Sequence, residues 1–417
     1  MDMDKYLTSY HVISALANLP QLVFEVTDAC NLRCKYCAYG EFYEDYDCRE
    51  NKMLSSENAI SLINYLVEYW NSGYNFSAFS NISISFYGGE PLLNFHFIKT
   101  VVSYIKNHVS CPHRKFSFSM TTNALLLHKY MDFLKDNDFY LLISLDGDKE
   151  NNGYRVDKVN ENSFDRIVAN IDGLRNRYPD YFITNVDFNA VLHNKNSVES
   201  IYRFFKYKYN KIPRIGELNS VGIRKDKMNK FNETYKNSQE SLYQAEHYEK
   251  IEQDMFMNSG NYRNLALFLH QYSGFVFKDY LDLLLDEKDA KYVPTGTCLP
   301  FSKKMFVTVN GKILPCERIG HQFSLGKVTD AGIELDIEQI VSKYNEYYRK
   351  IESQCNICKN HRSCIQCIFN LENRDGSLIC HGYMGEKQFQ NYINVQMAFL
   401  EDHPDAYRKI MEDVFVV

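Results

Sequence analysis

Short apolar segments alternate with amphipathic segments along the first half of the chain. The apolar runs predict strands at residues 22–26, 81–86, 115–122, 139–145, 184–191 and 214–221. Between them, apolar residues at helical spacing predict helices at residues 54–70, 97–108, 128–137, 163–177 and 198–207. This regular alternation predicts a parallel sheet covered by helices, in which ligands gather at the carboxyl ends of the strands.

The second half has a different pattern. Residues 224–297 are polar, with helical spacing at 242–257, 262–269 and 280–285, and they predict a helical bridge. Residues 305–309 and 312–314 flank Asn310-Gly311, which is typical of a β-hairpin turn. Further helices are expected between residues 388 and 414.

Composition narrows the class of protein. The 417 residues are 45% hydrophobic and carry a net charge of -6, so no general electrostatic attraction to nucleic acid or to an anionic membrane is expected. Residues 1–19 lack the form of a signal peptide, and no apolar run reaches membrane-spanning length, which predicts a cytoplasmic protein. Twelve cysteines in such a chain indicate metal binding rather than disulfides.

The first three of the clustered cysteines directly follow the first predicted strand. Cys30, Cys34 and Cys37 can bind three corners of an iron-sulfur cube, because thiolates are the ligands such clusters prefer. Three ligands leave the fourth iron open for chemistry, whereas a structural site is usually closed. The alternatives are a zinc knuckle or three unrelated thiols.

This spacing, with Tyr36 before the third cysteine, resembles the signature of the radical SAM superfamily. The resemblance implies a 4Fe-4S cluster whose open iron binds S-adenosylmethionine and whose electron cleaves it to a radical that takes a substrate hydrogen. Gly88-Gly89-Glu90, after the second strand, matches the family motif for the methionine amino group, and Ser144 with Arg155 corresponds to the carboxylate contact. Arg166 is a rival for Arg155, because the family's usual His-Asp is absent before it. The residues assigned to S-adenosylmethionine are Tyr36, Gly88, Gly89, Glu90, Asn123, Ser144 and Arg155.

The remaining clustered cysteines, all beyond residue 297, resemble the SPASM extension, which holds two auxiliary 4Fe-4S clusters. By position, one cluster would use Cys355, Cys358, Cys364 and Cys380, and the other would use Cys298, Cys316 and Cys367. An eighth thiolate is missing, so the second set uses Glu317 or His321, or keeps an open iron. Only two residues separate Cys364 from Cys367 where the family commonly has three. A zinc ribbon is the alternative.

The resemblance implies an α/β fold: a partial (β/α)6 TIM-like barrel followed by a small cysteine-rich domain with a β-hairpin and helices. The expected divisions are a barrel at 1–223, a bridge at 224–297, a SPASM domain at 298–385 and C-terminal helices at 386–417.

The leading functional hypothesis is a maturase that forms a thioether or carbon-carbon crosslink in a ribosomally made peptide. Glu317 would be the general base that takes the proton released on oxidation. The implied partners are a precursor peptide and an electron donor such as flavodoxin or ferredoxin. A leader would be recognised by a separate protein, by the bridge or by the C-terminal helices. The alternatives are an anaerobic sulfatase maturase, which forms formylglycine, and a non-catalytic zinc- or cluster-binding scaffold.

Overall fold

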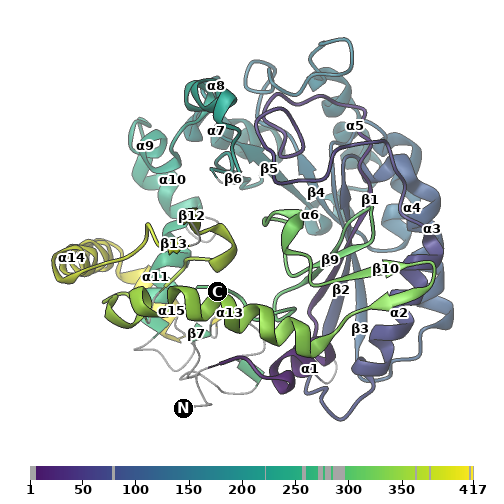
Figure 1. The fold of residues 1–417 in the computed structure, drawn as a ribbon. Coiled ribbons are helices and arrows are strands. Elements are labelled where there is room, and N and C mark those ends of the chain that lie inside the picture. Colours follow the sequence, from purple (N-terminus) through teal and green to yellow (C-terminus); the bar gives the residue numbers. More distant parts are fainter. Residues whose placement is uncertain are drawn as a thin grey trace.

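A computed structural model gives the fold (Figure 1) and describes residues 6–416, apart from 78–79, 221, 256–259, 271–275, 278–282, 285–295, 362–363, 375–376 and 413–414. Its centre is a ten-stranded sheet with the order β11-β10-β9-β8-β1-β2-β3-β4-β5-β6. Six parallel strands make up the barrel part: β1 (Gln21–Thr27), β2 (Asn81–Gly88), β3 (Lys115–Thr122), β4 (Tyr140–Ser144), β5 (Val186–Val191) and β6 (Arg214–Gly216).

Alternate residues of each strand point to opposite faces of the sheet. Helices cover the face that carries the buried apolar residues. In β2, Ile82, Ile84 and Phe86 are buried in the core, whereas Ser83 and Ser85 face the other way. Figure 1 shows the helices along the outside of the sheet. They are α2 (Ser56–Trp70), α3 (Phe95–His108), α4 (Leu127–Asp136), α5 (Phe164–Arg177), α6 (Pro179–Asn185) and α7 (Val198–Tyr209), with a 3₁₀ turn at Pro91–Asn94.

The predicted strands and helices of this half are present with shifted ends. One part of the prediction is wrong: residues 184 and 185 end helix α6 instead of starting a strand. Pro179 occupies the first turn of α6, where its fixed φ favours a helix and its missing N–H costs no hydrogen bond. The apolar residues nearby fit a helix and a strand equally well, so periodicity alone did not separate them.

The predicted hairpin is present as β8 (Met305–Val307) and β9 (Lys312–Leu314). It joins the barrel sheet, because β8 pairs in parallel with β1, with Leu22 opposite Met305. Strands β10 (Gly326–Thr329) and β11 (Gly332–Glu334) extend the sheet beyond it. The sheet therefore crosses the domain boundary expected at residue 298, and places the hairpin that ends just before Cys316 beside the first strand of the barrel.

Helices and short strands complete the structure. Helix α1 (Ser9–Ala17) contacts the long α13 (Ile337–Ile357), where Asn345 accepts from the Leu7 backbone N–H at 2.9 Å. The expected bridge contains α8 (Met228–Thr234), α9 (Ser238–Tyr243), α10 (Tyr248–Met255) and α11 (Gly260–His270), with most of 280–285 outside the described residues. The other elements are β7 (Val276–Phe277), β12 (Glu372–Arg374), β13 (Ser377–Ile379), α14 (Glu386–Asp402), α15 (Pro404–Glu412) and β14 (Phe415–Val416). Among the helices of the described residues, none combines the length and apolar character needed to cross a membrane.

Candidate active site

The loop of Cys30, Cys34 and Cys37 leaves the carboxyl end of β1 and is held by backbone hydrogen bonds. The N–H groups of Arg33 and Lys35 donate to the carbonyls of Val156 and Tyr154, at 2.7 and 3.1 Å. A second loop, which follows β4, therefore fixes the path of the first. The three thiols come from one short segment at the end of the sheet where parallel α/β folds bind ligands.

Each thiol lies near a nitrogen donor. Arg49 Nη2 is 3.4 Å from Cys37 Sγ, Arg155 Nη1 is 3.9 Å from Cys34 Sγ, and Asn123 Nδ2 is 3.8 Å from Cys30 Sγ. Burial raises the pKa of Cys34 to about 12 and the pKa of Cys30 to about 11. Buried thiols become thiolates when a metal supplies positive charge, and nitrogen donors around sulfur are typical of iron-sulfur sites. This donor set fits a cluster.

Gly88 and Gly89 let the end of β2 approach this loop closely. The Gly89 N–H donates to the Thr27 carbonyl at 2.8 Å, and a Cβ at Gly89 would lie 2.1 Å from the carbonyl oxygen of Ala29. Gly88 has φ +126°, a conformation that other residues rarely adopt. Both positions therefore require glycine, and the cysteine loop packs directly against their backbone.

Glu90 is completely buried, and its carboxylate accepts three hydrogen bonds from the protein. The donors are the Thr122 hydroxyl at 2.7 Å and the backbone N–H groups of Asn123 at 2.8 Å and Leu92 at 3.1 Å. Burial raises the pKa of Glu90 to about 7, although the three donors oppose this shift. These contacts give Glu90 a structural role in tying the ends of β2 and β3 together. Its expected contact with a cofactor stays a prediction.

A buried network around Asp146 is the part of the site that the sequence analysis missed. Asp146 Oδ1 forms an ion pair with Arg155 Nη2 at 3.0 Å, and the Tyr36 hydroxyl donates to the other carboxylate oxygen. His193 Nε2 lies 3.6 Å from Asp146 Oδ2, and its ring stacks on Tyr36 with 5.5 Å between centroids. The signal was present, because Asp146 follows the assigned Ser144 by only two positions.

The structure distinguishes between the two arginines that the sequence analysis considered for the carboxylate contact. Arg155 is buried beside Cys34, and its Nε has no hydrogen-bond partner among the described residues. Arg166 is half exposed and pairs with Asp157 at 2.6 Å, in a surface ion pair. Ser144 lies at the carboxyl end of β4, opposite Asn189 of β5. The burial of Arg155 favours it over Arg166 as a site residue.

The face of the barrel strands that turns away from the helices encloses a cavity of about 870 Å³. Its lining mixes polar and apolar side chains, and the hydroxyls of Ser83, Ser85 and Ser119 lie within hydrogen-bond distance of one another, at 2.6 to 3.3 Å. Glu317 also lines this cavity, with its carboxylate 3.1 Å from Lys304 Nζ and 3.7 Å from Cys316 Sγ. A carboxylate therefore faces a space of the size that a substrate side chain and its neighbours would need.

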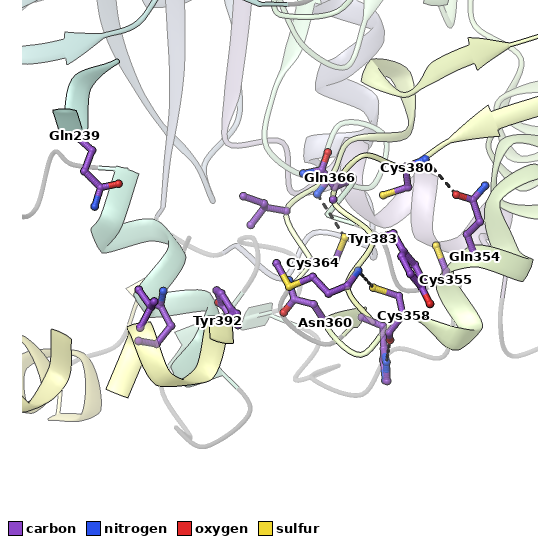
Figure 2. A pocket seen from close by; sticks show the side chains of 16 residues that line it. Gln239, Gln354, Cys355, Cys358, Asn360, Cys364, Gln366, Cys380, Tyr383 and Tyr392 are labelled. Carbon is purple, nitrogen blue, oxygen red and sulfur yellow. Dashed lines mark hydrogen bonds between the residues drawn. The ribbon is translucent and has the colours of Figure 1, made fainter. Parts of the chain in front are cut away.

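The C-terminal cysteines form two groups. Figure 2 shows Cys355, Cys358, Cys364 and Cys380 around one pocket of about 310 Å³. Burial raises the pKa of Tyr344 well above its ordinary value, and Cys298, Cys316 and Cys367 all lie near enough to its hydroxyl to add to that shift.

Of the two predicted candidates for an eighth ligand, Glu317 lies beside Cys316, whereas His321 contacts Asp47 and Tyr46. His321 lies next to Asp47, whose backbone N–H is 3.1 Å from His321 Nδ1. The His321 Nε2 atom is buried and has no hydrogen-bond partner among the described residues. Nowhere in the described part of the chain do three His, Cys, Asp or Glu side chains meet at one single-ion site. A 4Fe-4S cube binds its thiolates at separate irons, so its ligands need not meet at one point.

Comparison with known proteins gives the class. Residues 24–207 match the family model of the Radical SAM superfamily, and this segment contains the cysteine loop, the two glycines and the Asp146 network. Residues 24–207 of the chain thus form a radical SAM domain, as its motifs predicted. The cofactors of that class are a 4Fe-4S cluster and S-adenosylmethionine.

The particular relatives include anaerobic sulfatase maturases and a cyclopropyl synthase. The cysteine-type anaerobic sulfatase-maturating enzyme of Clostridium novyi is 33% identical over 198 residues, which cover 46% of this chain and about half of the relative, 49%. The enzyme of the same name from Clostridium perfringens is 24% identical over 396 residues, covering 90% of this chain and 98% of the relative. The radical SAM cyclopropyl synthase TigE of Paramaledivibacter caminithermalis is 29% identical over 178 residues, 40% of this chain and 34% of the relative.

A solved structure shows the same fold. Native anSMEcpe with bound AdoMet and Cp18Cys peptide superposes with a TM-score of 0.60 at 19% identity, covering 94% of this chain and 98% of the other. The predicted fold class, a partial barrel followed by a cysteine-rich domain, is confirmed by this match.

Proposed function

We propose that the chain oxidises a residue of a peptide or protein substrate, with Cys30, Cys34 and Cys37 holding a 4Fe-4S cluster. When bound, this cluster supplies the electron that cleaves S-adenosylmethionine, and the resulting radical takes a hydrogen atom from the substrate. The observation that carries the proposal is the position of the three thiols, which lie at the ends of the parallel strands beside Arg49 and the buried Arg155.

The binding of S-adenosylmethionine is assigned to residues around the same loop. Arg155 would donate to the methionine carboxylate through its unpaired Nε, with Ser144 alongside, because a guanidinium suits a carboxylate. Asp146 and Tyr36 hold that guanidinium in place. The backbone at Gly88 and Gly89 and the Asn123 amide complete the set.

The C-terminal thiols would hold two auxiliary clusters. Cys355, Cys358, Cys364 and Cys380 surround one pocket and would complete a four-thiolate site. Cys298, Cys316 and Cys367 would hold the other, with the fourth iron open or bound by a residue other than cysteine. A flavodoxin or ferredoxin is the class of electron donor that such an enzyme needs.

Glu317 is proposed as the general base. Its burial would by itself raise the pKa of the carboxyl, but Lys304, a backbone N–H and Arg318 together hold that pKa below its usual range. An ionised carboxylate beside the cavity can take a proton from the substrate after the hydrogen atom has left. An auxiliary cluster held by the C-terminal thiols would accept the remaining electron, so the substrate would lose two hydrogens in total and the electrons would balance.

The oxidation of a cysteine or serine to formylglycine is the reaction best supported. The alignment with the Clostridium perfringens maturase extends over nearly the whole of both chains, and the shared fold is that of an enzyme solved with a cysteine-containing peptide. These findings favour the sulfatase maturase over the crosslinking maturase that the sequence analysis placed first. Crosslinking is the second candidate, because seven C-terminal thiols leave one iron that a substrate cysteine could bind.

Mass spectrometry separates the two reactions. The anaerobically reconstituted protein is incubated with S-adenosylmethionine, dithionite and a sulfatase-derived peptide that contains the target cysteine. Loss of two hydrogens from the cysteine gives a thioaldehyde, and water then converts it to formylglycine with release of hydrogen sulfide. A crosslink also removes two hydrogens but retains the sulfur. A peptide that stays unmodified, together with intact S-adenosylmethionine, would overturn the proposal.

The role of Glu317 is tested with Glu317→Gln. Loss of a general base should lower the rate of peptide oxidation roughly 100-fold or more, while S-adenosylmethionine is still cleaved. The control is Glu334→Gln, at an exposed carboxylate on β11. Equal peptide oxidation by the two variants would remove Glu317 from the mechanism.

A further inference from the structure

A second cavity, of about 1200 Å³, lies between helices α9–α10 of the bridge and helices α14–α15 at the C-terminal end. We call it the acidic groove. We infer that the acidic groove binds a lysine- or arginine-bearing segment of the substrate polypeptide, away from the residue that is oxidised. This inference rests on the proposed function, in that the bound segment belongs to a peptide or protein substrate.

The charge of the acidic groove has one sign. Its lining includes Glu249, Glu252, Asp402 and Asp405, and no lysine or arginine is among the described residues that line it. Asp405 forms an ion pair with Arg408, at 3.3 Å, one helical turn further along α15. The groove therefore attracts a positively charged segment and repels an acidic one.

Glu252 gives an independent indication of a cationic ligand. It lies on α10, is only 6% exposed, and its Oε2 is 3.5 Å from His403 Nε2. The other oxygen, Oε1, is buried and accepts no hydrogen bond from the described residues. A buried carboxylate oxygen without a donor is costly, and an ammonium or guanidinium group in the groove would supply one.

Aromatic side chains along the acidic groove suit the same ligand. Tyr243 and Tyr248 line it, are 51% and 37% exposed, and contact each other edge to face with 5.6 Å between ring centroids. Phe399 stacks on His403 at 4.1 Å on the opposite side. Exposed rings beside carboxylates favour lysine and arginine, because the alkyl stem packs on a ring and the cationic head attracts its face.

The acidic groove is continuous with the pocket of the four C-terminal cysteines. Gln239, Val395 and Gln396 line both cavities. Figure 2 shows Gln239 and Tyr392 on the side of the cysteine pocket that faces away from Cys355 and Cys380. A polypeptide segment in the groove would therefore lie beside the C-terminal cysteine domain, as a remote contact that raises affinity without taking part in the chemistry.

Fluorescence anisotropy tests the inference directly. Fluorescein-labelled hexalysine and hexaglutamate are titrated with the full reconstituted chain under anaerobic conditions. Hexalysine should bind, with an affinity that falls as salt is added, and hexaglutamate should not. The double variant Asp402→Asn, Asp405→Asn should bind hexalysine roughly tenfold more weakly. The matched control Glu401→Gln, at an exposed carboxylate of α14 outside the groove, should stay within about twofold of the original affinity.

Similar binding of the two peptides would overturn the inference, and so would unchanged hexalysine binding in the double variant. It would also be overturned if sedimentation showed that the chain is a dimer in which a second copy covers the groove. Glu252→Gln, which keeps the buried shape, should weaken hexalysine binding as well.

A catalytic readout separates this inference from the proposed function. A lysine tail on the substrate peptide should lower KM without changing kcat, and the double variant should abolish that gain. If peptide is oxidised but the tail and the variant have no effect on KM, the acidic groove is not a substrate site and the proposed function stands. If hexalysine binds in the groove but no peptide is oxidised, the proposed function fails and the cation site stands.

Discussion

Replacing Asp146 by asparagine removes a charge from the buried ion pair with Arg155 and keeps the side chain's shape. The two charged groups are 3.0 Å apart, and their side chains are 0% and 7% exposed. Loss of one partner leaves the other charge buried and unpaired, which typically costs about 3–5 kcal/mol. This is a large part of the roughly 5–15 kcal/mol by which proteins are stable. The Asp146→Asn protein should therefore unfold at a much lower urea concentration than the original.

The chain contains a matched control. Lys149 and Asp165 form a closer pair, at 2.6 Å, but their side chains are 61% and 66% exposed. Solvent screens that pair, so Asp165→Asn should cost about 0–1 kcal/mol. Distance alone would rank the two pairs the other way, so the comparison tests whether burial decides the energy.

Urea unfolding of both variants, followed by circular dichroism under anaerobic conditions, measures the difference. Asp146→Asn should also weaken S-adenosylmethionine binding, because the carboxylate that positions Arg155 is lost. Equal unfolding midpoints for the two variants would refute the reasoning about the buried pair.

Three further predictions concern the ends of the strands. Cys34→Ala should lose about four iron atoms per chain and all S-adenosylmethionine cleavage, whereas Cys48→Ala, at an exposed thiol, should keep both; full activity in the first variant would contradict the cluster assignment. Gly89→Ala should lower the thermal midpoint and the affinity for S-adenosylmethionine, because its Cβ would meet a carbonyl oxygen at 2.1 Å. The control Gly173→Ala, on α5, has open space around its Cβ and should stabilise the protein by up to about 1 kcal/mol. For Glu90, the pKa in the folded protein is about 7, above the ordinary value of 4.5. The contribution of Glu90 to stability is therefore complete below pH 4.5 and is lost as the pH rises through about 7. Glu90→Gln should flatten the fall of the thermal midpoint between about pH 5 and about pH 8, and an unchanged slope would show that another group causes it.

The strand-helix alternation and the motifs at strand ends were readable from the sequence, because both depend on local spacing. Cys30, Cys34 and Cys37 follow an apolar strand, and Gly88-Gly89 ends the next strand. Parallel strands bring their carboxyl ends together, so motifs far apart in sequence could be placed at one site.

Features that depend on long-range packing were missed. Nothing local indicated that His193 would meet Asp146, since the two are joined only by the pairing of β4 with β5. The role of Glu90 as a tie between strands likewise depends on three donors from other segments. The acidic groove forms between helices that are separated by about 130 residues of the chain, since α10 ends at Met255 and α14 begins at Glu386.

Deuterium transfer is the most direct test of the central claim, that this chain removes a hydrogen atom from a peptide by radical chemistry. A peptide with a cysteine deuterated at Cβ is incubated with the reconstituted protein, S-adenosylmethionine and dithionite, and the 5'-deoxyadenosine formed is analysed by mass spectrometry. The account predicts one deuterium in the 5'-deoxyadenosine and an oxidised peptide in equal amounts. Unlabelled 5'-deoxyadenosine beside an oxidised peptide, or no 5'-deoxyadenosine at all, would contradict it.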